Sequence, residues 1–130
     1  MYLVKGVRYR RETAMITTVE RKAEVREAIA RLVAWMNEAH AAHHAKHFKN
    51  LAPETYEVAG GRKYIRIAQV GQYGGRSVHC FVDAATGDVY KAGGWKAPAL
   101  NGARYNILDA DSLETLKAKW DPYTSYLYKR

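Results

Sequence analysis

The sequence predicts a single α+β domain, in which one long amino-terminal helix packs on an antiparallel meander of three or four strands and a short carboxy-terminal helix completes the layer. Two patterns carry this prediction: an apolar stripe at helical spacing over residues 17–49, and alternating strands around a glycine-containing turn within residues 60–130. The size agrees, because 130 residues with 48% hydrophobic side chains match one domain with one modest core. Residues 1–16 are expected to form a basic arm or a short strand.

The helix prediction depends on periodicity. Thr17 and Glu20 have the spacing of a capping box, and no Gly or Pro follows before Pro53. We therefore expect the helix to run from Thr18 to about Phe48. One face should be apolar, because side chains three or four residues apart lie together on a helix. These side chains are Val25, Ile29, Leu32, Met36, Ala39 and His43.

The hairpin from Arg76 to Lys91 is the centre of the predicted sheet. Its turn contains Gly87, which can adopt a positive φ. Three strands are expected, at Lys63 to Val70, Ser77 to Asp83 and Val89 to Ala92. Alternation along the middle strand should place Val78, Cys80 and Val82 on one face, and Ser77, His79 and Phe81 on the other.

The last third of the chain is expected to contain an ordered loop, a short helix and a final strand. The loop covers Trp95 to Asn106, and the strand covers Ser125 to Tyr128. Asp111 or Ser112 can cap the helix, and Pro122 prevents its extension.

Electrostatics point to an anionic partner. The net charge is +8. Residues 60–106 contain two acids, Asp83 and Asp88, against seven bases, namely Arg62, Lys63, Arg66, Arg76, Lys91, Lys96 and Arg104. Such an excess attracts phosphates through long-range electrostatics and counterion release. The alternative is a cationic surface that only maintains solubility.

Aromatic residues are interleaved with these bases, so rings could stack on nucleotide bases while cations neutralise phosphates. The alternative is that Phe81, Trp95 and Tyr105 form the packed core under the long helix. The predicted ligand-binding set is Arg66, Arg76, His79, Lys91, Trp95, Lys96, Arg104 and Tyr105.

The sequence offers little for catalysis, and we expect no catalytic residue, no metal and no cofactor. His40/His44 and His43/His47 are spaced i,i+4 on the helix, as two metal ligands would be, but favourable interaction with the helix dipole or packing explains them without a ligand. Cys80 is the single cysteine and is expected to be buried, where a thiolate is disfavoured.

The cellular setting is predicted from absences in the sequence. No segment has the roughly 18 to 20 apolar residues needed to span a bilayer, and the amino terminus lacks a secretory pattern. A lone cysteine excludes an intramolecular disulfide and agrees with a reducing, intracellular environment.

The carboxy-terminal two thirds resembles a family of small uncharacterised bacteriophage proteins. The resemblance covers about residues 48–130. It rests on the strings RSVHCFVD at 76–83, TGDVYK at 86–91, WKAPA at 95–99 and ARYN at 103–106, with GRKYI at 61–65 and Tyr126-Leu127 near the end. It implies a phage accessory protein acting in the bacterial host cytoplasm, and it implies no activity.

Our leading hypothesis is a non-enzymatic protein that binds a phosphate-bearing partner, either nucleic acid or a nucleotide, through a basic and aromatic surface. A second hypothesis is an interaction factor that blocks a host or defence protein or packs into the virion, with the long helix mediating self-association or partner binding. A third is a sponge that sequesters a nucleotide signal. An enzyme would have His79 as its acid–base group.

Overall fold

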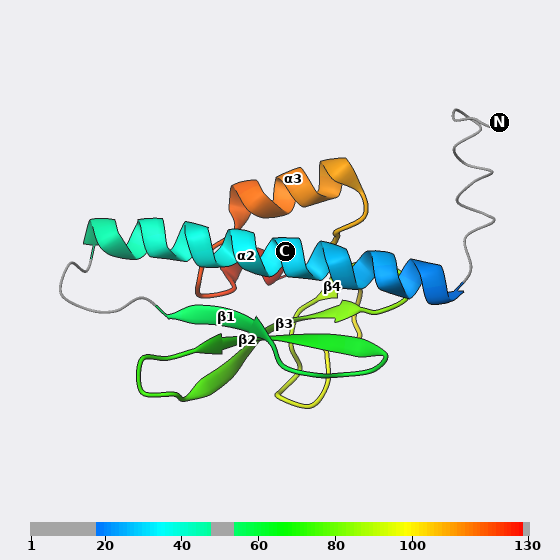
Figure 1. The fold of residues 1–130 in the computed structure, drawn as a ribbon, viewed down its shortest axis with the longest axis horizontal. Helices are drawn as coiled ribbons and strands as arrows, with labels where there is room; N and C mark the ends of the chain where they lie inside the picture. Colours follow the sequence, from blue (N-terminus) through cyan, green and yellow to red (C-terminus); the bar gives the residue numbers. More distant parts are fainter. Residues whose placement is uncertain (1–17, 48–53, 129–130) are drawn as a thin grey trace.

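The computed structural model describes residues 18–47 and 54–128. The predicted basic arm, the proposed cap at Thr17 and residues 48–53 lie outside this description. In chain order the elements are helix α2 (Thr18–His47), strands β1 (Thr55–Val58), β2 (Tyr64–Val70), β3 (Arg76–Asp83), β4 (Asp88–Tyr90) and β5 (Tyr105–Asn106), helix α3 (Ala110–Lys119) and the 3-10 helix η1 (Ser125–Leu127). The α+β class is confirmed: α2 and α3 lie on the same side of the sheet (Figure 1).

The sheet is an antiparallel meander whose spatial order follows the sequence, β1-β2-β3-β4-β5. Its five strands exceed the expected three or four, because β1 and β5 have only four and two residues and give little alternation to recognise. β5 lies in the segment predicted as a loop. Ser125 to Tyr128 does not form a strand: the carboxylate of Asp121 accepts hydrogen bonds from the backbone N–H groups of Tyr123 and Ser125, and these bonds turn the chain.

Helix α2 follows the predicted apolar stripe for most of its length. Val25, Ile29, Leu32 and Met36 are buried against the sheet. The end of the stripe was wrong: the next buried residue is His40, and His43 is exposed. His40 packs on Tyr56 of β1, with ring centroids 5.6 Å apart, whereas the last turns of α2 extend beyond the start of β1 (Figure 1).

The core fills the space between the helices and one face of the sheet. Its sheet side is formed by Tyr56, Ile65, Ile67, Cys80, Val82 and Val89, and Leu116 and Leu127 close it from the carboxy-terminal elements. Cys80 is buried as predicted, and burial raises the pKa of its thiol to about 12. The thiol is therefore protonated and inert in the folded protein.

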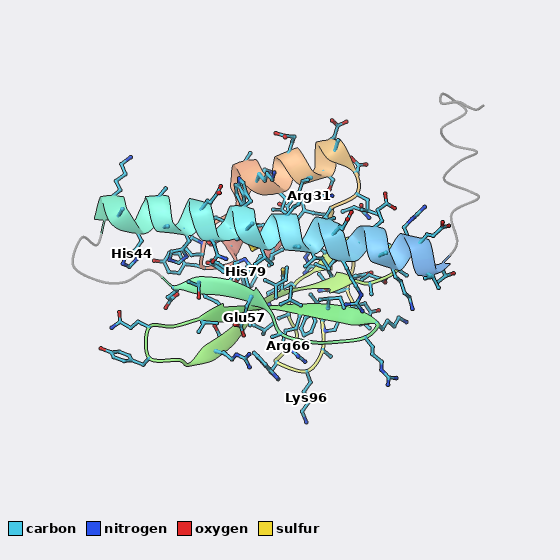
Figure 2. The ribbon with its side chains drawn as sticks, in the orientation of Figure 1. Arg31, His44, Glu57, Arg66, His79 and Lys96 are labelled. Carbon is cyan, nitrogen blue, oxygen red and sulfur yellow. The ribbon has the colours of Figure 1, made fainter. Side chains whose placement is uncertain are left out.

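A β-bulge alters the predicted faces of β3. Ile67 pairs with Cys80 and Ala68 pairs with Val78, so His79 is an extra residue with no partner on β2. The extra residue shifts the alternation, because two consecutive residues of a bulge oppose one residue of the neighbouring strand. His79 consequently lies between the sheet and α2 (Figure 2), with its ring 5.2 Å from that of Tyr56. The prediction that His79 shares a face with Phe81 was wrong.

Phe81 lies on the opposite face of the sheet, beneath the loop that follows β4. It pairs with Arg66 across β2 and β3 and is 1% exposed, although it does not belong to the core under α2. Within this loop, an isolated antiparallel bridge joins Ala92 to Pro98. The expected joint packing of Phe81, Trp95 and Tyr105 under α2 is therefore wrong, and of the three only Tyr105 packs against that core.

The N-cap of helix α3 lies two residues before Asp111 and three before Ser112, the two predicted caps. Asp109 is the N-cap, and its Oδ1 accepts a hydrogen bond from the backbone N–H of Ser112 at 3.0 Å. Leu116 is fully buried, and Trp120 at the end of α3 packs edge-on against Trp35 of α2 with ring centroids 5.6 Å apart. These contacts hold α3 beside α2.

One side chain of α2 forms hydrogen bonds with the backbone of strand β1. Asn37 accepts a hydrogen bond from the backbone N–H of Tyr56 at 2.7 Å and donates one to its carbonyl oxygen at 3.1 Å. The amide therefore satisfies both backbone groups of Tyr56, as a neighbouring strand would.

Of the helices in the part of the chain that the structure describes, none is long and apolar enough to cross a membrane.

Candidate functional site

The predicted ligand-binding residues do not form one cluster; they divide among separate sets of contacts. Arg66 and Trp95 lie together on the sheet face opposite α2. The guanidinium carbon of Arg66 is 4.5 Å from the centroid of the Trp95 indole and 5.5 Å from that of Phe81. Arg66 also donates hydrogen bonds to the carbonyl oxygens of Trp95 at 2.6 Å and Ala59 at 2.7 Å. The guanidinium of Arg66 thus connects the loop that contains Ala59 to the loop that contains Trp95.

Arg104, Tyr105 and Lys91 surround the carboxy-terminal segment. Arg104 donates to the backbone carbonyl oxygen of Leu127 at 2.6 Å, and the hydroxyl of Tyr105 donates to the backbone carbonyl oxygen of Tyr126 at 3.1 Å. The ammonium nitrogen of Lys91 lies 4.6 Å from the centroid of the Tyr128 ring. These contacts hold the carboxy-terminal segment against β5 and against the residues that adjoin β4 and β5.

Arg76 and Lys96 are separate again. Arg76 forms an ion pair with Glu57 of β1. Lys96 is exposed and extends away from the body of the protein on the side opposite α2 (Figure 2). It lines a shallow hollow formed by the loop residues 93–98, in which Trp95 is the only aromatic side chain among the described lining residues.

His79 belongs to a buried polar and aromatic cluster instead of a binding surface. It is 2% exposed, and its Nε2 lies 2.7 Å from the hydroxyl of Tyr126. His40 and Tyr56 continue the cluster, with Nδ1 of His40 2.9 Å from the Tyr56 hydroxyl. Burial lowers the pKa of His79 to about 4 and lowers that of His40, so both imidazoles are neutral at pH 7.

A convergent set of cations exists elsewhere, at the amino-terminal half of α2. Lys22 and Arg26 of α2 and Arg62 and Lys63 of the loop between β1 and β2 line one hollow of about 510 Å³. Its remaining wall is the turn from Asp83 to Thr86. We call this the basic pocket.

The basic pocket has a strong excess of positive charge. Asp83 is the one acid among the described lining residues, and its Oδ1 already accepts hydrogen bonds from the backbone N–H groups of Ala85 at 2.8 Å and Thr86 at 3.1 Å. Within the described residues, none of the four cations joins an ion pair. Lys22 and Arg26 are also spaced i,i+4, where like charges destabilise a helix by a few tenths of a kcal/mol. A bound anion would relieve this repulsion.

The loop that carries Arg62 and Lys63 is fixed by backbone bonds. Arg66 N–H donates to Gly60 O at 2.9 Å, and Ala84 N–H donates to Lys63 O at 2.8 Å. Gly61 has φ +113°, and a Cβ at this position would overlap the carbonyl oxygen of Tyr64. Only glycine fits there. The backbone that carries Arg62 and Lys63 is therefore fixed before any ligand arrives, which reduces the part of the entropy cost of binding that comes from ordering the loop.

The sequence contained part of the signal for this pocket. Arg62 and Lys63 were counted in the basic excess but were not placed in the predicted site. The i,i+4 spacing of Lys22 and Arg26 was readable on the polar face of the helix. The convergence of these two residues with Arg62 and Lys63 could not be read from the sequence, because it depends on how α2 crosses the sheet.

The histidines of α2 do not assemble a metal site with other residues that the structure describes. No group of three or more His, Cys, Asp or Glu side chains with the geometry to hold a metal ion occurs in residues 18–47 and 54–128.

Comparison with known proteins places the chain in a family. The profile of a family of unknown function, DUF7717, matches residues 9–129. The chain belongs to this family. No curated protein matches the chain, and no solved structure matches it.

Proposed function

We propose that this protein binds nucleic acid through its phosphates, and that the basic pocket is the contact site. The observation that supports the proposal is the convergence of Lys22, Arg26, Arg62 and Lys63 on one hollow whose only described acid is already bonded to a turn. Four cations that form no ion pair among the described residues favour an extended polyanion, because each phosphate neutralised releases condensed counterions.

The composition of the pocket favours a backbone contact over recognition of a base. No aromatic side chain is among its described lining residues, so a base would have no ring on which to stack. A mononucleotide would be held by its phosphates alone. A nucleic-acid strand that passes the pocket supplies several phosphates in succession, and it therefore gains more binding free energy from the same four cations than a mononucleotide does.

The test is fluorescence anisotropy with a labelled 20-nucleotide single strand at several salt concentrations. Four phosphate contacts predict a slope of about −3 in log K against log [salt]. Lys22→Ala with Lys63→Ala should weaken binding and reduce the magnitude of this slope by about 1.4. The matched control is Lys46→Ala with Lys119→Ala, which removes the same charge from two exposed positions elsewhere.

The proposal fails if the strand does not bind at low salt, or if both double variants weaken binding equally. Equal weakening would mean that net charge alone attracts the strand. Displacement of the strand by stoichiometric amounts of a mononucleotide would instead favour the nucleotide-binding hypothesis.

A further inference from the structure

A second hollow lies at the other end of α2, about 27 Å along the helix axis from the basic pocket. Its volume is about 490 Å³, within the range of small-molecule sites. His40, His43 and His44 of α2 form one side, and the turn between β2 and β3 and the loop after α3 form the others. His44 marks this end of α2 in Figure 2. We call it the histidine-end pocket.

Among the lining residues that the structure describes, the charge of the histidine-end pocket is opposite in sign to the net charge of the protein. No Lys or Arg is among its described lining residues, and Glu54 is the one carboxylate. Gln69 donates a hydrogen bond from Nε2 to Oε1 of Glu54. This bond fixes the carboxylate, and it leaves the second carboxylate oxygen and the amide oxygen of Gln69 as hydrogen-bond acceptors. A Cβ on Gly71 would lie 3.9 Å from Oε2 of Glu54, so this oxygen lies next to the β2–β3 turn that lines the pocket.

Aromatic side chains line the same pocket as this acceptor pair. Tyr73 and Tyr123, which are 92% and 73% exposed, stand on two sides of the pocket, and the imidazole of His40 packs 6.1 Å from that of His44. Tyrosines and a carboxylate that line one pocket form a suitable site for an organic cation, because the negative face of each ring attracts the same charge as the carboxylate. The apolar area of the rings accommodates the rest of such a ligand.

From this arrangement we infer a binding site for a small organic cation: a primary ammonium group, attached to an apolar or aromatic body, that donates hydrogen bonds to Glu54 and Gln69. The ammonium supplies the donors that both acceptors lack. The body lies between Tyr73 and Tyr123. This site is independent of the basic pocket, which has the opposite charge and lies at the opposite end of α2.

The probe is benzylamine, and its neutral isostere benzyl alcohol is the reference ligand. Both are titrated into the full-length protein while backbone amide NMR shifts are followed. Benzylamine should bind about fivefold more tightly than benzyl alcohol, with shifts at residues 69–75 and 122–123. Glu54→Gln should remove this preference and leave the affinity for benzyl alcohol unchanged. Glu114→Gln, which removes an exposed carboxylate on α3, should change neither affinity.

Equal affinity for the two ligands in the native protein would overturn the inference, as would shifts confined to other residues or a preference that survives Glu54→Gln. If Glu54→Gln does not fold, Tyr123→Ala replaces it, and this exposed substitution should weaken benzylamine binding severalfold. Nucleic-acid binding by Glu54→Gln, measured by anisotropy, should equal that of the native protein, so failure at one site is distinguishable from failure at the other.

Discussion

Acidification should destabilise the fold through His79. The imidazole is buried beside Tyr56 and Trp120, and burial is the main reason that its pKa falls from 6.5 to about 4. Between these two values the unfolded chain binds a proton that the folded chain does not, so stability is fully present above about pH 6.5 and is lost as the pH falls towards 4. This difference in pKa corresponds to about 3 kcal/mol in total, of which about 2 kcal/mol is lost between pH 7.5 and 5.

The assay is urea unfolding, followed by tryptophan fluorescence, at pH 7.5 and at pH 5. His79→Gln should be less stable than the native protein at pH 7.5, but its loss of stability on acidification should be smaller by about 2 kcal/mol. Tyr126→Phe is the control: it removes the hydroxyl that lies 2.7 Å from Nε2 of His79 but keeps the imidazole buried, so its pH dependence should remain close to native. His40 also has a lowered pKa and contributes in the same direction in all three proteins. If His79→Gln and the native protein lose equal stability on acidification, the buried neutral imidazole is not the cause.

Three further predictions concern single residues. Gly61→Ala should cost about 3 kcal/mol in urea unfolding, because the new Cβ meets the Tyr64 carbonyl at a positive φ; Gly94→Ala, where a Cβ meets nothing within 4 Å, should cost much less. Cys80 should react with a thiol reagent only as fast as the protein unfolds, since burial raises its pKa to about 12, and rapid labelling of native protein would contradict this. Arg104→Ala should cost about 2 kcal/mol and increase hydrogen exchange near the chain end, because the Leu127 carbonyl loses its donor; unchanged exchange there would show that this bond is dispensable.

The parts of the fold that were predicted from the sequence have long, regular patterns. The apolar stripe of α2 and the strands around Gly87 extend over enough residues for their periods to be read; the strands and the stripe as far as Met36 are confirmed, whereas the predicted end of the stripe at His43 was wrong. β1 and β5 were missed because four and two residues carry almost no period. The 3-10 helix at Ser125–Leu127 was missed because the Asp121 side chain determines the local backbone there.

The site was harder to predict than the fold, for a different reason. One inserted residue in β3 moves His79 to the side of α2, and strict alternation cannot anticipate a bulge. The predicted cations were correctly recognised as a basic excess, but Arg66, Arg76 and Arg104 are engaged with other parts of the same chain. Binding by the predicted set stays a prediction, as does the phage-related role. Composition shows how many charges are present, whereas only the packing shows which of them remain unpaired.

The hydrogen bonds between Asn37 and Tyr56 have a consequence for self-association. An edge strand with open backbone groups is a template on which another chain can add a strand, and such addition starts aggregation. Here the Asn37 side chain occupies the outward N–H and C=O of Tyr56 in β1, at 2.7 and 3.1 Å, so this part of the edge is already paired within its own chain. Replacing Asn37 with leucine would reopen this edge. The main effect of this substitution would be the formation of fibrils or oligomers in concentrated samples. The melting temperature of a dilute sample would change less.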